Sequence, residues 1–468
     1  MLIYLQYPYG LLALIALALL FWRPIWGLAL LAAIFPMDPW SPRLPVPGVN
    51  TETILIGVAL AVTVLRFGAR LPPLRYSGPV LAFIAVMFVS FVIAVPWARG
   101  LQGPDGGPVI WPIFKAVKSM TFTALLFFSA YWWVREPEDR QRMLEALCVG
   151  LFLSSVAGIL DYAIGINPSR IEGRASGFVG DPNEMAESIG SMMFVPLYLL
   201  MRGRELGMRW RAFAAASYGL AATAMVLALS RGNWIAFLAA HAVFLLLVNR
   251  TLLIGAVATV AVLLTVGFPL LPEVVRERIE VTTQTGSVVY QVPLALNLES
   301  STASRVVFAR IGLDMFRRSP IWGHGMHAFA YNSREYGAKY GLNAPKDPHN
   351  LVVKMAVEAG LIGVGVLAWV IWAVFRCGRR LWRSNSPEYL LGAVLLAAAT
   401  HILVANLSAT SFLYAKQISA QFWILYALSA RAYLERDAAQ EAPAAQAVVP
   451  AGRWRRFAQR TPVAVSHP

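Results

Sequence analysis

The sequence predicts an all-α polytopic membrane protein, with about 12 to 13 transmembrane helices and one large loop that holds further helices. Hydrophobic residues make up 58% of the 468 residues and charged residues only 14%, and the mean hydropathy is +0.58. Apolar stretches long enough to cross a bilayer, which takes about 20 residues, recur along most of the chain. In lipid each stretch has to be a helix, because the backbone must satisfy its own hydrogen bonds.

The expected spans follow one another with short connections. We place them near residues 3–22, 24–38, 52–66, 79–95, 117–134, 143–163, 182–202, 212–229, 232–248, 251–267, 351–375, 387–407 and 414–431. The first two are either one span or a broken pair, interrupted at Arg23-Pro24. The first segment has neither a basic start nor a small-residue cleavage site, so we interpret it as a retained helix and not a signal peptide.

Basic residues predict the orientation of the spans. They cluster on alternate loops, at Arg66/Arg70/Arg75, Arg135/Arg140/Arg142, Arg202/Arg204/Arg209/Arg211 and Arg376/Arg379/Arg380/Arg383. Under the positive-inside rule the side that they share is the cytoplasm. The chain then divides into N-terminal helices over 1–267, a periplasmic loop over 268–350, C-terminal helices over 351–431 and a cytoplasmic, disordered tail over 432–468.

The net charge of +15 has the same explanation, because the basic residues lie in short loops and no basic domain exists to bind nucleic acid. Two cysteines, Cys148 and Cys377, give neither a disulfide framework nor a cysteine metal site. The outer loops carry no Asp-x-Asp pair and no His/Asp/Glu cluster with ligand spacing. We therefore expect no metal ion and no other cofactor.

The outer loop over 268–350 is too long to be a simple connector. Residues 281–292 alternate weakly, like a hairpin around Gly286, and residues 302–318 have helical periodicity. On that helix Arg305 falls in the middle of the apolar face, which contains Phe308, Ala309, Gly312, Met315 and Phe316, while Arg310, Asp314 and Arg317 share another side. A guanidinium on an apolar face should meet an anion; the alternative is an arginine that snorkels to water or pairs with a carboxylate.

A second arginine, Arg231, lies in the tight turn Ser230-Arg231-Gly232 between two spans. Ser230 is positioned to cap the following helix, which places Arg231 in the first turn, where a cation opposes the helix dipole. Such a cation usually has an external anion beside it. The alternative is ordinary snorkelling to lipid headgroups.

A third element is a specific helix start. Asp181 is the expected N-cap, Pro182 occupies the first helical position and Glu184 lies three residues after the cap. Arg174 and Asn183 should lie beside this cap, at the outer face.

The helices that start near residues 181, 230 and 350 all run from the outside to the inside, so their amino termini should converge. Converging amino termini form an anion site. With Arg174, Arg231 and Arg305 nearby, and Lys115 and Lys118 at the outer end of another span, the site would suit a diphosphate.

The run Asp347-Pro348-His349-Asn350-Leu351 closes the long loop. Of the six histidines, only His349 combines the outer boundary with a polar, helix-starting context. A neutral imidazole there can accept a proton from a sugar hydroxyl; the alternative is a capping or interfacial histidine. For Glu358, farther along the helix, we expect a structural pair with Lys354.

These motifs resemble the O-antigen ligase and repeat-unit polymerase superfamily of bacterial envelope glycosyltransferases. The matching pieces are Gly177 to Asn183, Ser230-Arg231-Gly232, Arg305 followed by Pro320-x-x-Gly323-x-Gly325, and His349-Asn350 with Glu358-x-Gly360-Leu361-x-Gly363. The resemblance implies metal-independent glycosyl transfer from undecaprenyl diphosphate to an acceptor hydroxyl, at the periplasmic face of the inner membrane.

Carried over to this chain, the family's roles assign Arg231 and Arg305 to the donor diphosphate and His349 to base catalysis. Arg174, Lys115, Lys118, Asn183 and Asn350 would complete the donor site. The acceptor is most simply lipid A-core, but family members also polymerise repeat units or glycosylate proteins. A polymerase would need a second anion site, which Lys115, Lys118 and Arg174 could build. A flippase or transporter is the remaining alternative, and would place charges deep in the spans.

Overall fold

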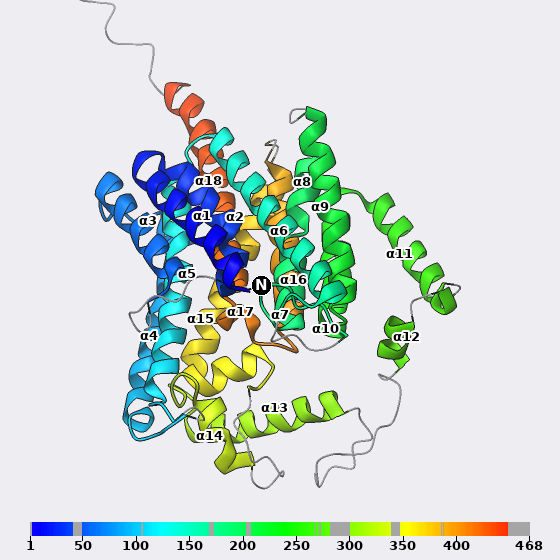
Figure 1. Cartoon of the computed structure of the whole chain (residues 1–468). Coiled ribbons are helices and arrows are strands. Elements are labelled where there is room, and N and C mark those ends of the chain that lie inside the picture. The colour runs from blue at the N-terminus through cyan, green and yellow to red at the C-terminus, as the bar shows by residue number, and fades with distance from the viewer. Residues whose placement is uncertain are drawn as a thin grey trace, which may run out of the picture.

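A computed structural model of the chain describes residues 2–40, 49–103, 106–167, 173–202, 207–265, 267–270, 273–280, 300–337, 347–384, 386 and 388–447. All regular elements in these ranges are helical (Figure 1). In chain order they are α1 (Leu2–Trp22), α2 (Pro24–Ile34), η1 (Phe35–Trp40), α3 (Thr51–Phe67), α4 (Leu74–Ala98), α5 (Ile110–Trp133), α6 (Pro137–Ile164), α7 (Pro182–Met192), α8 (Phe194–Met201), α9 (Gly207–Leu227), α10 (Arg231–Val248), α11 (Arg250–Thr265), η2 (Phe268–Leu270), α12 (Glu273–Glu280), α13 (Ser300–Arg318), α14 (Ala328–Gly337), α15 (Leu351–Trp382), α16 (Tyr389–Ala405), α17 (Ser411–Tyr414) and α18 (Lys416–Ala447).

The predicted all-α polytopic membrane fold is confirmed. Among the described residues, five helices are long and apolar enough to cross a membrane: Leu74–Ala98, Ile110–Trp133, Pro137–Ile164, Arg231–Val248 and Leu351–Trp382. Four shorter apolar helices accompany them. This number is smaller than the expected 12 to 13, partly because several predicted spans are shorter or divided.

Prolines mark two helix boundaries: one was predicted at Arg23-Pro24, and the other divides a predicted span. Arg23 separates α1 from α2, which begins with Pro24 at its first position. Residues 182–202, expected as one span, form α7 and α8. The first of these helices ends at Met192, four residues before Pro196, whose ring clashes with the carbonyl of that residue in a continuous helix.

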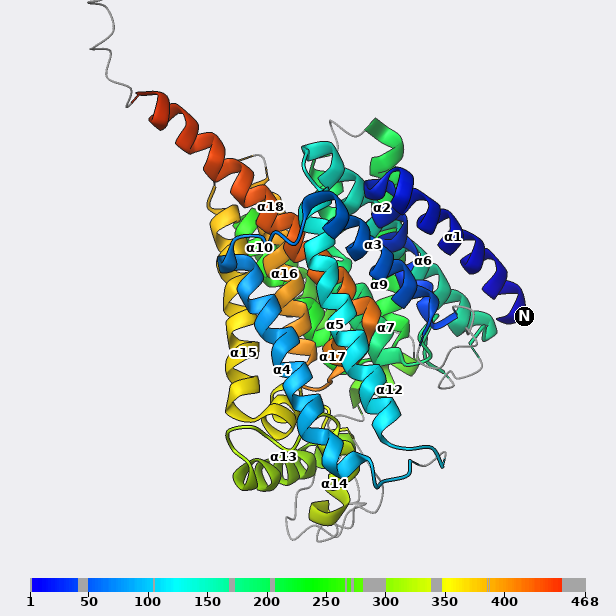
Figure 2. The ribbon, with the colours of Figure 1, turned by 90° about the vertical axis from the view of Figure 1, so that its left-hand side faces the viewer.

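The centre of the bundle is built from helices that are apolar on every side. Nearly all of α16 is buried, as is most of α18 up to Ala432. A helix that is hydrophobic all round belongs in the interior, and the two lie between α5, α10 and α15 (Figures 1 and 2). The helix α18 continues to Ala447, past the predicted end at residue 431, so the first part of the expected disordered tail is helical.

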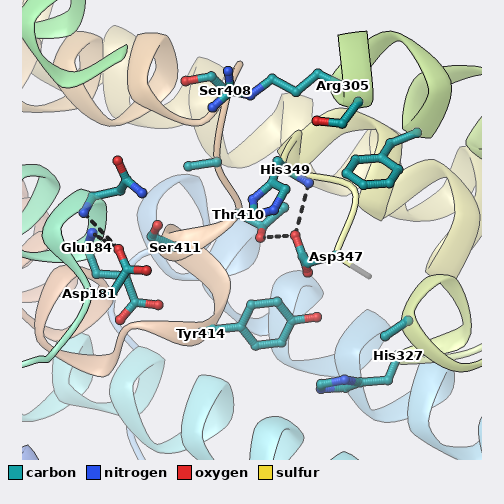
Figure 3. A pocket seen from close by; sticks show the side chains of 15 residues that line it. Asp181, Glu184, Arg305, His327, Asp347, His349, Ser408, Thr410, Ser411 and Tyr414 are labelled. Atoms are coloured by element: carbon teal, nitrogen blue, oxygen red, sulfur yellow. Dashed lines mark hydrogen bonds between the residues drawn. The ribbon is translucent and has the colours of Figure 1, made fainter. Parts of the chain in front are cut away.

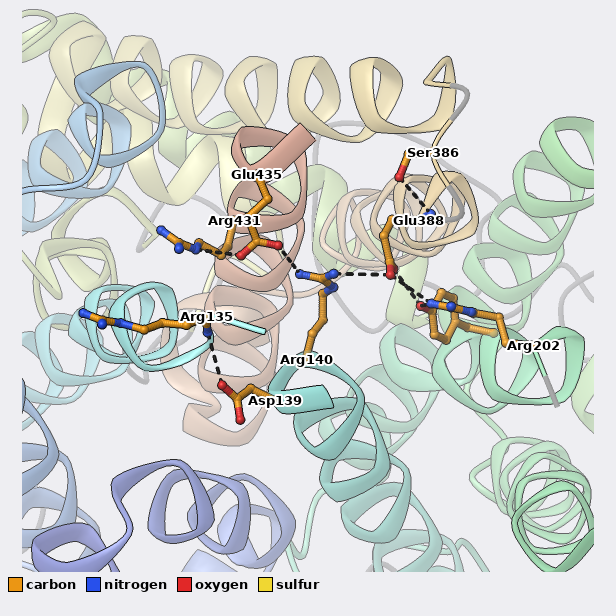
Figure 4. A network of polar contacts seen from close by, with 9 residues as sticks. Arg135, Asp139, Arg140, Arg202, Ser386, Glu388, Arg431 and Glu435 are labelled. Carbon is orange, nitrogen blue, oxygen red and sulfur yellow. Dashed lines mark hydrogen bonds and ion pairs between the residues drawn. The ribbon is translucent and has the colours of Figure 1, made fainter. Parts of the chain in front are cut away.

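Four basic clusters gather at one end of the bundle, which we call the basic end. There Arg140 of α6 contacts Glu388 at 3.3 Å and Glu435 at 3.0 Å, and Arg202 contacts Glu388 at 2.9 Å. Figure 4 shows this network joining α6, α8, α18 and the start of α16. The guanidinium of Arg75 lies over Tyr433 of α18, which also lines a hollow with the arginines at the end of α15.

The helices α13 and α14 lie at the opposite end (Figure 2). The predicted helix over 302–318 is thus confirmed by α13. The hairpin predicted over 281–292 lies outside the described residues.

A break in α15 attaches these loop helices to the bundle. Gly360 has φ +63°, a left-handed conformation inside α15. The turn over residues 320–325 fills the break with its backbone: His324 N donates to Val357 O at 2.8 Å, Gly325 N to Glu358 O at 3.0 Å, and Leu361 N to Pro320 O at 2.8 Å. A Cβ atom on Gly323 would lie 2.5 Å from the backbone nitrogen of Ala359, so the approach requires glycine. This break was not predicted from the sequence.

Candidate functional site

A cavity of about 620 Å³ lies between the bundle and the loop helices (Figure 3). The start of α7, α13, the 347–349 segment and the residues from Ser408 to Tyr414 contribute to its wall. Its lining residues are Asp181, Asn183, Glu184, Ser304, Arg305, Phe308, His327, Ala330, Asp347, His349, Ser408, Ala409, Thr410, Ser411 and Tyr414. Segments more than 200 residues apart in sequence therefore meet in one polar hollow.

The connection between α16 and α17 organises this cavity. The backbone oxygen of Asn406 accepts a hydrogen bond from Leu351 N, at the start of α15, over 3.0 Å. The Asn406 side chain donates to Glu187 of α7 and accepts from Phe412 N at 3.2 Å. One connection thus fixes the starts of α7 and α15 relative to each other, and it presents Ser408, Thr410 and Ser411 to the cavity.

A buried cation lies behind the wall. The Nζ atom of Lys354, in the first turn of α15, contacts Glu358 Oε1 at 2.7 Å and Asp347 Oδ2 at 3.2 Å. It also lies 4.4 Å from the centre of the Tyr414 ring. The predicted structural pair between Lys354 and Glu358 is confirmed, and Asp347 extends it to the cavity.

Asp347 is an anion held in place by several donors. Burial alone would raise the pKa of its carboxyl, but the charge of Lys354 and hydrogen bonds from Thr410 and from the backbone of His349 outweigh it and lower the pKa. The carboxylate is therefore ionised near neutral pH. It accepts the backbone N–H of His349 at 3.0 Å, which fixes the turn that carries the imidazole.

His349 is exposed and lies against the cavity. Its φ is +49°, a conformation uncommon for a residue with a side chain, and the hydrogen bond to Asp347 maintains it. The imidazole centre is 6.1 Å from that of Phe308 on α13. In Figure 3 the imidazole lies between Asp347 and Arg305.

Arg305 reaches the cavity from α13. The buried side chains of this helix, Val307, Phe308, Ile311 and Met315, pack against Ala328, Phe329 and Val357. The expected apolar face is thus present, although Ala309, which we placed on it, is exposed. Figure 3 shows the Arg305 side chain extending across the cavity toward Ser408. The expectation that this arginine faces a site that can hold an anion is consistent with this position.

The start of α7 follows its predicted pattern. Asp181 caps the helix and accepts Asn183 N at 2.7 Å and Glu184 N at 3.1 Å. The Asn183 side-chain oxygen accepts from Arg174 Nη2 at 3.2 Å and from Ser230 Oγ at 2.8 Å. Arg174 and Asn183 therefore lie together beside the cap, as expected.

The prediction that the Ser230 hydroxyl caps α10 is wrong. Ser230 occupies the N-cap position without a side-chain cap: its oxygen accepts from the Asn233 side-chain amide at 3.0 Å, and its hydroxyl donates to Asn183. Arg231 begins α10 at the edge of the cavity but is not a lining residue. Its neighbours contact the wall: Ser230 bonds Asn183, and a Cβ atom on Gly232 would meet the hydroxyl of Ser408.

The three expected helix starts do converge around the 406–411 connection, but two are already capped by their own side chains. Asp181 caps α7, and Asn350 caps α15 by accepting Val353 N at 3.0 Å. The Asn350 amide also donates to Leu407 O at 3.0 Å, so this residue supports the wall without lining it. Only the amino terminus of α10, beside Arg231, lacks such a side-chain cap among the three.

Lys115 and Lys118 are not brought to the cavity. Both lie on α5, where the Nζ atom of Lys118 donates to Thr53 Oγ1 of α3 at 2.8 Å, and Lys115 is exposed. Neither is among the lining residues.

Sequence reasoning missed several lining residues. His327 lies low in the cavity beside Tyr414, with ring centres 5.1 Å apart, and burial lowers its pKa to about 3. Asp347, Glu184 and Asp181 add three carboxylates to a wall that we expected to be basic. A usable signal was present in the run Asn406-Leu407-Ser408-Ala409-Thr410-Ser411, a polar interruption between two apolar spans.

A comparison with known protein families matches one segment of the chain. Residues 216–368 match the family model described as O-antigen ligase. This segment of the chain is therefore similar to the O-antigen ligase family. The matched segment contains Arg231, Arg305 and His349, and it confirms the resemblance to the O-antigen ligase and polymerase superfamily. It supports a glycosyltransferase activity of the kind found in that family, with a lipid-linked glycan donor and a glycan acceptor. The comparison with curated proteins gives no match.

Proposed function

We propose that the protein transfers a saccharide from undecaprenyl diphosphate to an acceptor hydroxyl without a metal ion, and that this acceptor belongs to lipid A-core. One observation carries the proposal. Arg305 and His349, which both belong to the segment that matches the O-antigen ligase model, line the same cavity. A cation for a leaving diphosphate and a proton acceptor for a hydroxyl thus face the same space.

In the proposed reaction, the acceptor oxygen forms a bond to the anomeric carbon of the donor sugar while the bond from that carbon to the diphosphate oxygen breaks. The electron pair of the broken bond leaves with the diphosphate, and the acceptor's proton passes to the imidazole of His349. Arg305, with Arg231 and the uncapped start of α10 at the edge, stabilises the charge that develops on the diphosphate.

The placement of the lysines favours ligation over polymerisation. A polymerase binds two diphosphate-linked substrates, and Lys115, Lys118 and Arg174 were the candidates for its second anion site. Lys118 contacts Thr53, neither lysine lines the cavity, and Arg174 donates to Ala228 O at 2.9 Å and to Asn183. The two lysines therefore do not supply a second anion site in this cavity.

The proposed orientation places the basic end in the cytoplasm and the cavity at the periplasmic face of the inner membrane. The positive-inside rule supports it, because the four arginine clusters gather at the end opposite to α13 and α14. A lipid-linked donor would then present its diphosphate to the cavity from the outer leaflet.

The test uses the purified full-length protein with undecaprenyl-diphosphate-linked glycan and lipid A-core. We expect His349→Ala to abolish transfer while donor binding persists. Arg305→Ala should lower the transfer rate by about 10²- to 10³-fold, the usual cost of removing a contact to developing charge. The matched control is Arg310→Ala, which removes an exposed arginine from the same helix and should leave the rate unchanged.

Full activity of the His349 variant would refute its role as the base. If the Arg310 control loses as much activity as the Arg305 variant, a specific diphosphate contact is excluded. Growth of glycan chains from lipid-linked repeats alone, without lipid A-core, would show that the protein is a polymerase.

A further inference from the structure

A second hollow lies at the basic end, far from the cavity described above. Its volume is about 820 Å³, and α10, α15, α16 and α18 form its wall. Its lining residues are Val243, Leu247, Trp372, Phe375, Arg376, Arg379, Arg380, Trp382, Arg383, Leu396, Thr400 and Tyr433. The wall thus combines four arginines with aromatic and aliphatic side chains and contains no carboxylate.

The four arginines share one face of α15. Positions 376, 379, 380 and 383 follow the spacing i, i+3, i+4 and i+7, which places like charges next to one another on a helix surface. Such neighbours repel. Their position at the carboxyl end of α15 offsets part of the repulsion through the helix dipole, but it supplies no counter-ion for the individual guanidinium groups.

Three buried or half-buried arginines at the same end are paired. Arg140 and Arg202 contact Glu388, and Arg431 contacts Glu435 at 2.9 Å. Within the described part of the chain, by contrast, none of the four arginines of the hollow forms an ion pair. The row therefore has no internal counter-ion among the described residues and can accept an external anion.

The remaining wall suits hydrocarbon. Trp372 of α15 is 53% exposed, and Trp369, one turn earlier on the same helix, is exposed as well. The guanidinium of Arg376 lies 4.8 Å from the centre of the Trp372 ring. Trp382 donates to Leu247 O at 2.9 Å and holds α10 against the end of α15. Aromatic side chains that lie between a charged row and an apolar helix surface are typical of the membrane–water interface.

From this arrangement we infer that the hollow binds an anionic phospholipid of the adjacent leaflet. The arginine row would contact the headgroup phosphate, and the surface formed by Val243, Leu247, Phe375 and Leu396 would lie along an acyl chain. Basic pockets between transmembrane helices bind anionic headgroups through this combination of charge and apolar surface. The occupant differs from the proposed donor and acceptor, and it binds at the opposite end of the bundle.

The full-length protein should be reconstituted in nanodiscs of dioleoyl-phosphatidylglycerol or dioleoyl-phosphatidylcholine, released, and analysed by native mass spectrometry for retained lipid. We expect phosphatidylglycerol to remain bound and phosphatidylcholine to be lost. The variant R376Q/R380Q should retain at least about tenfold less phosphatidylglycerol. The control R209Q/R211Q removes two exposed arginines at the start of α9 and should retain as much as the unmodified protein.

If both double variants lose phosphatidylglycerol to the same extent, retention depends only on the general surface charge, and the inference is overturned. Equal retention of the two lipids would overturn it as well. Inorganic phosphate at millimolar concentration should not displace the lipid, and complete displacement would identify a site for soluble anions instead. Because the readout is bound lipid and not glycosyl transfer, the result is independent of the proposed enzymatic function.

Discussion

The Nζ atom of Lys354 lies 3.2 Å from Oδ2 of Asp347, so a fully buried cation of α15 holds a carboxylate of the cavity wall. Glu358 binds the same Nζ atom from the other side. Asp347, whose carboxylate holds the His349 turn, is therefore fixed from beneath by a lysine whose side chain is fully buried. Stability and the position of the proposed base depend on the same three side chains.

Replacing Lys354 by Met should destabilise the protein by about 3–5 kcal/mol, because it leaves Glu358 buried without its cation. The double variant K354M/E358L removes both buried charges and should recover part of this loss. Thermal unfolding of the full-length protein in detergent measures the two effects. Unchanged melting of K354M would show that the pair is not a stabilising element.

Asp347 should act as a positioning residue for His349. In Asp347→Asn the carboxylate that accepts the His349 backbone N–H and the Thr410 hydroxyl becomes an amide, and its attraction to Lys354 is lost. We expect kcat to fall by about tenfold to 100-fold, with little change in KM for the donor, because the proposed base is displaced while the arginines remain. A change confined to KM would instead place Asp347 in donor binding.

The break in α15 gives a direct comparison of two glycines in one helix. Gly360→Ala forces a side chain into a left-handed conformation and against the backbone of Ile321, so we expect a destabilisation of more than about 1 kcal/mol. Gly365→Ala is the matched control, because a Cβ atom there meets nothing within 4 Å. Its melting temperature should be unchanged or slightly higher. Equal melting temperatures for the two variants would contradict the structural role of Gly360.

His327 should make the protein sensitive to acid. Burial, together with the nearby charge of Lys354, lowers its pKa from 6.5 to about 3, while Asp347 opposes the shift. Between pH 6.5 and 3 the histidine of the unfolded protein binds a proton that the folded protein does not bind. The free energy of unfolding therefore decreases, as the pH is lowered through this range, by up to about 1.4 kcal/mol per pH unit. His327→Gln removes this contribution. Its melting temperature should decline less steeply than that of the unmodified protein below pH 6.5, and parallel declines would refute the assignment.

The positions of the helices could be predicted from the sequence because the apolar stretches are long and the polar residues between them are few. The cap at Asp181, the pair of Lys354 with Glu358 and the helix that carries Arg305 followed from local spacing. Local spacing could not reveal the break at Gly360, because glycine is common in membrane helices and the break forms only when the distant 320–325 turn docks there.

Which residues line the cavity depends on which helices pack together. The sequence of a single segment does not specify that packing. Lys118 was placed in the donor site because it lies near the outer end of its span, yet α5 packs against α3 and its amine bonds Thr53. Ser230 had the right position for a cap, but its oxygen accepts from the Asn233 side chain instead. Ser408 and Thr410 were overlooked because their importance comes from contacts with segments that precede them by more than 60 residues in the sequence.

The turn over 320–325 is joined to α15 through peptide groups and not through side chains. Peptide groups are the same in every residue, so this joint constrains the shape of the chain but tolerates change in the exposed Ile321 and Trp322, whose side chains are 55% and 56% accessible. Substitutions at these two positions should therefore leave the joint intact, because the glycines at 323, 325 and 360 determine how closely the two backbones approach. The outer surface of this turn can thus vary in sequence while the path of the backbone at the break is kept.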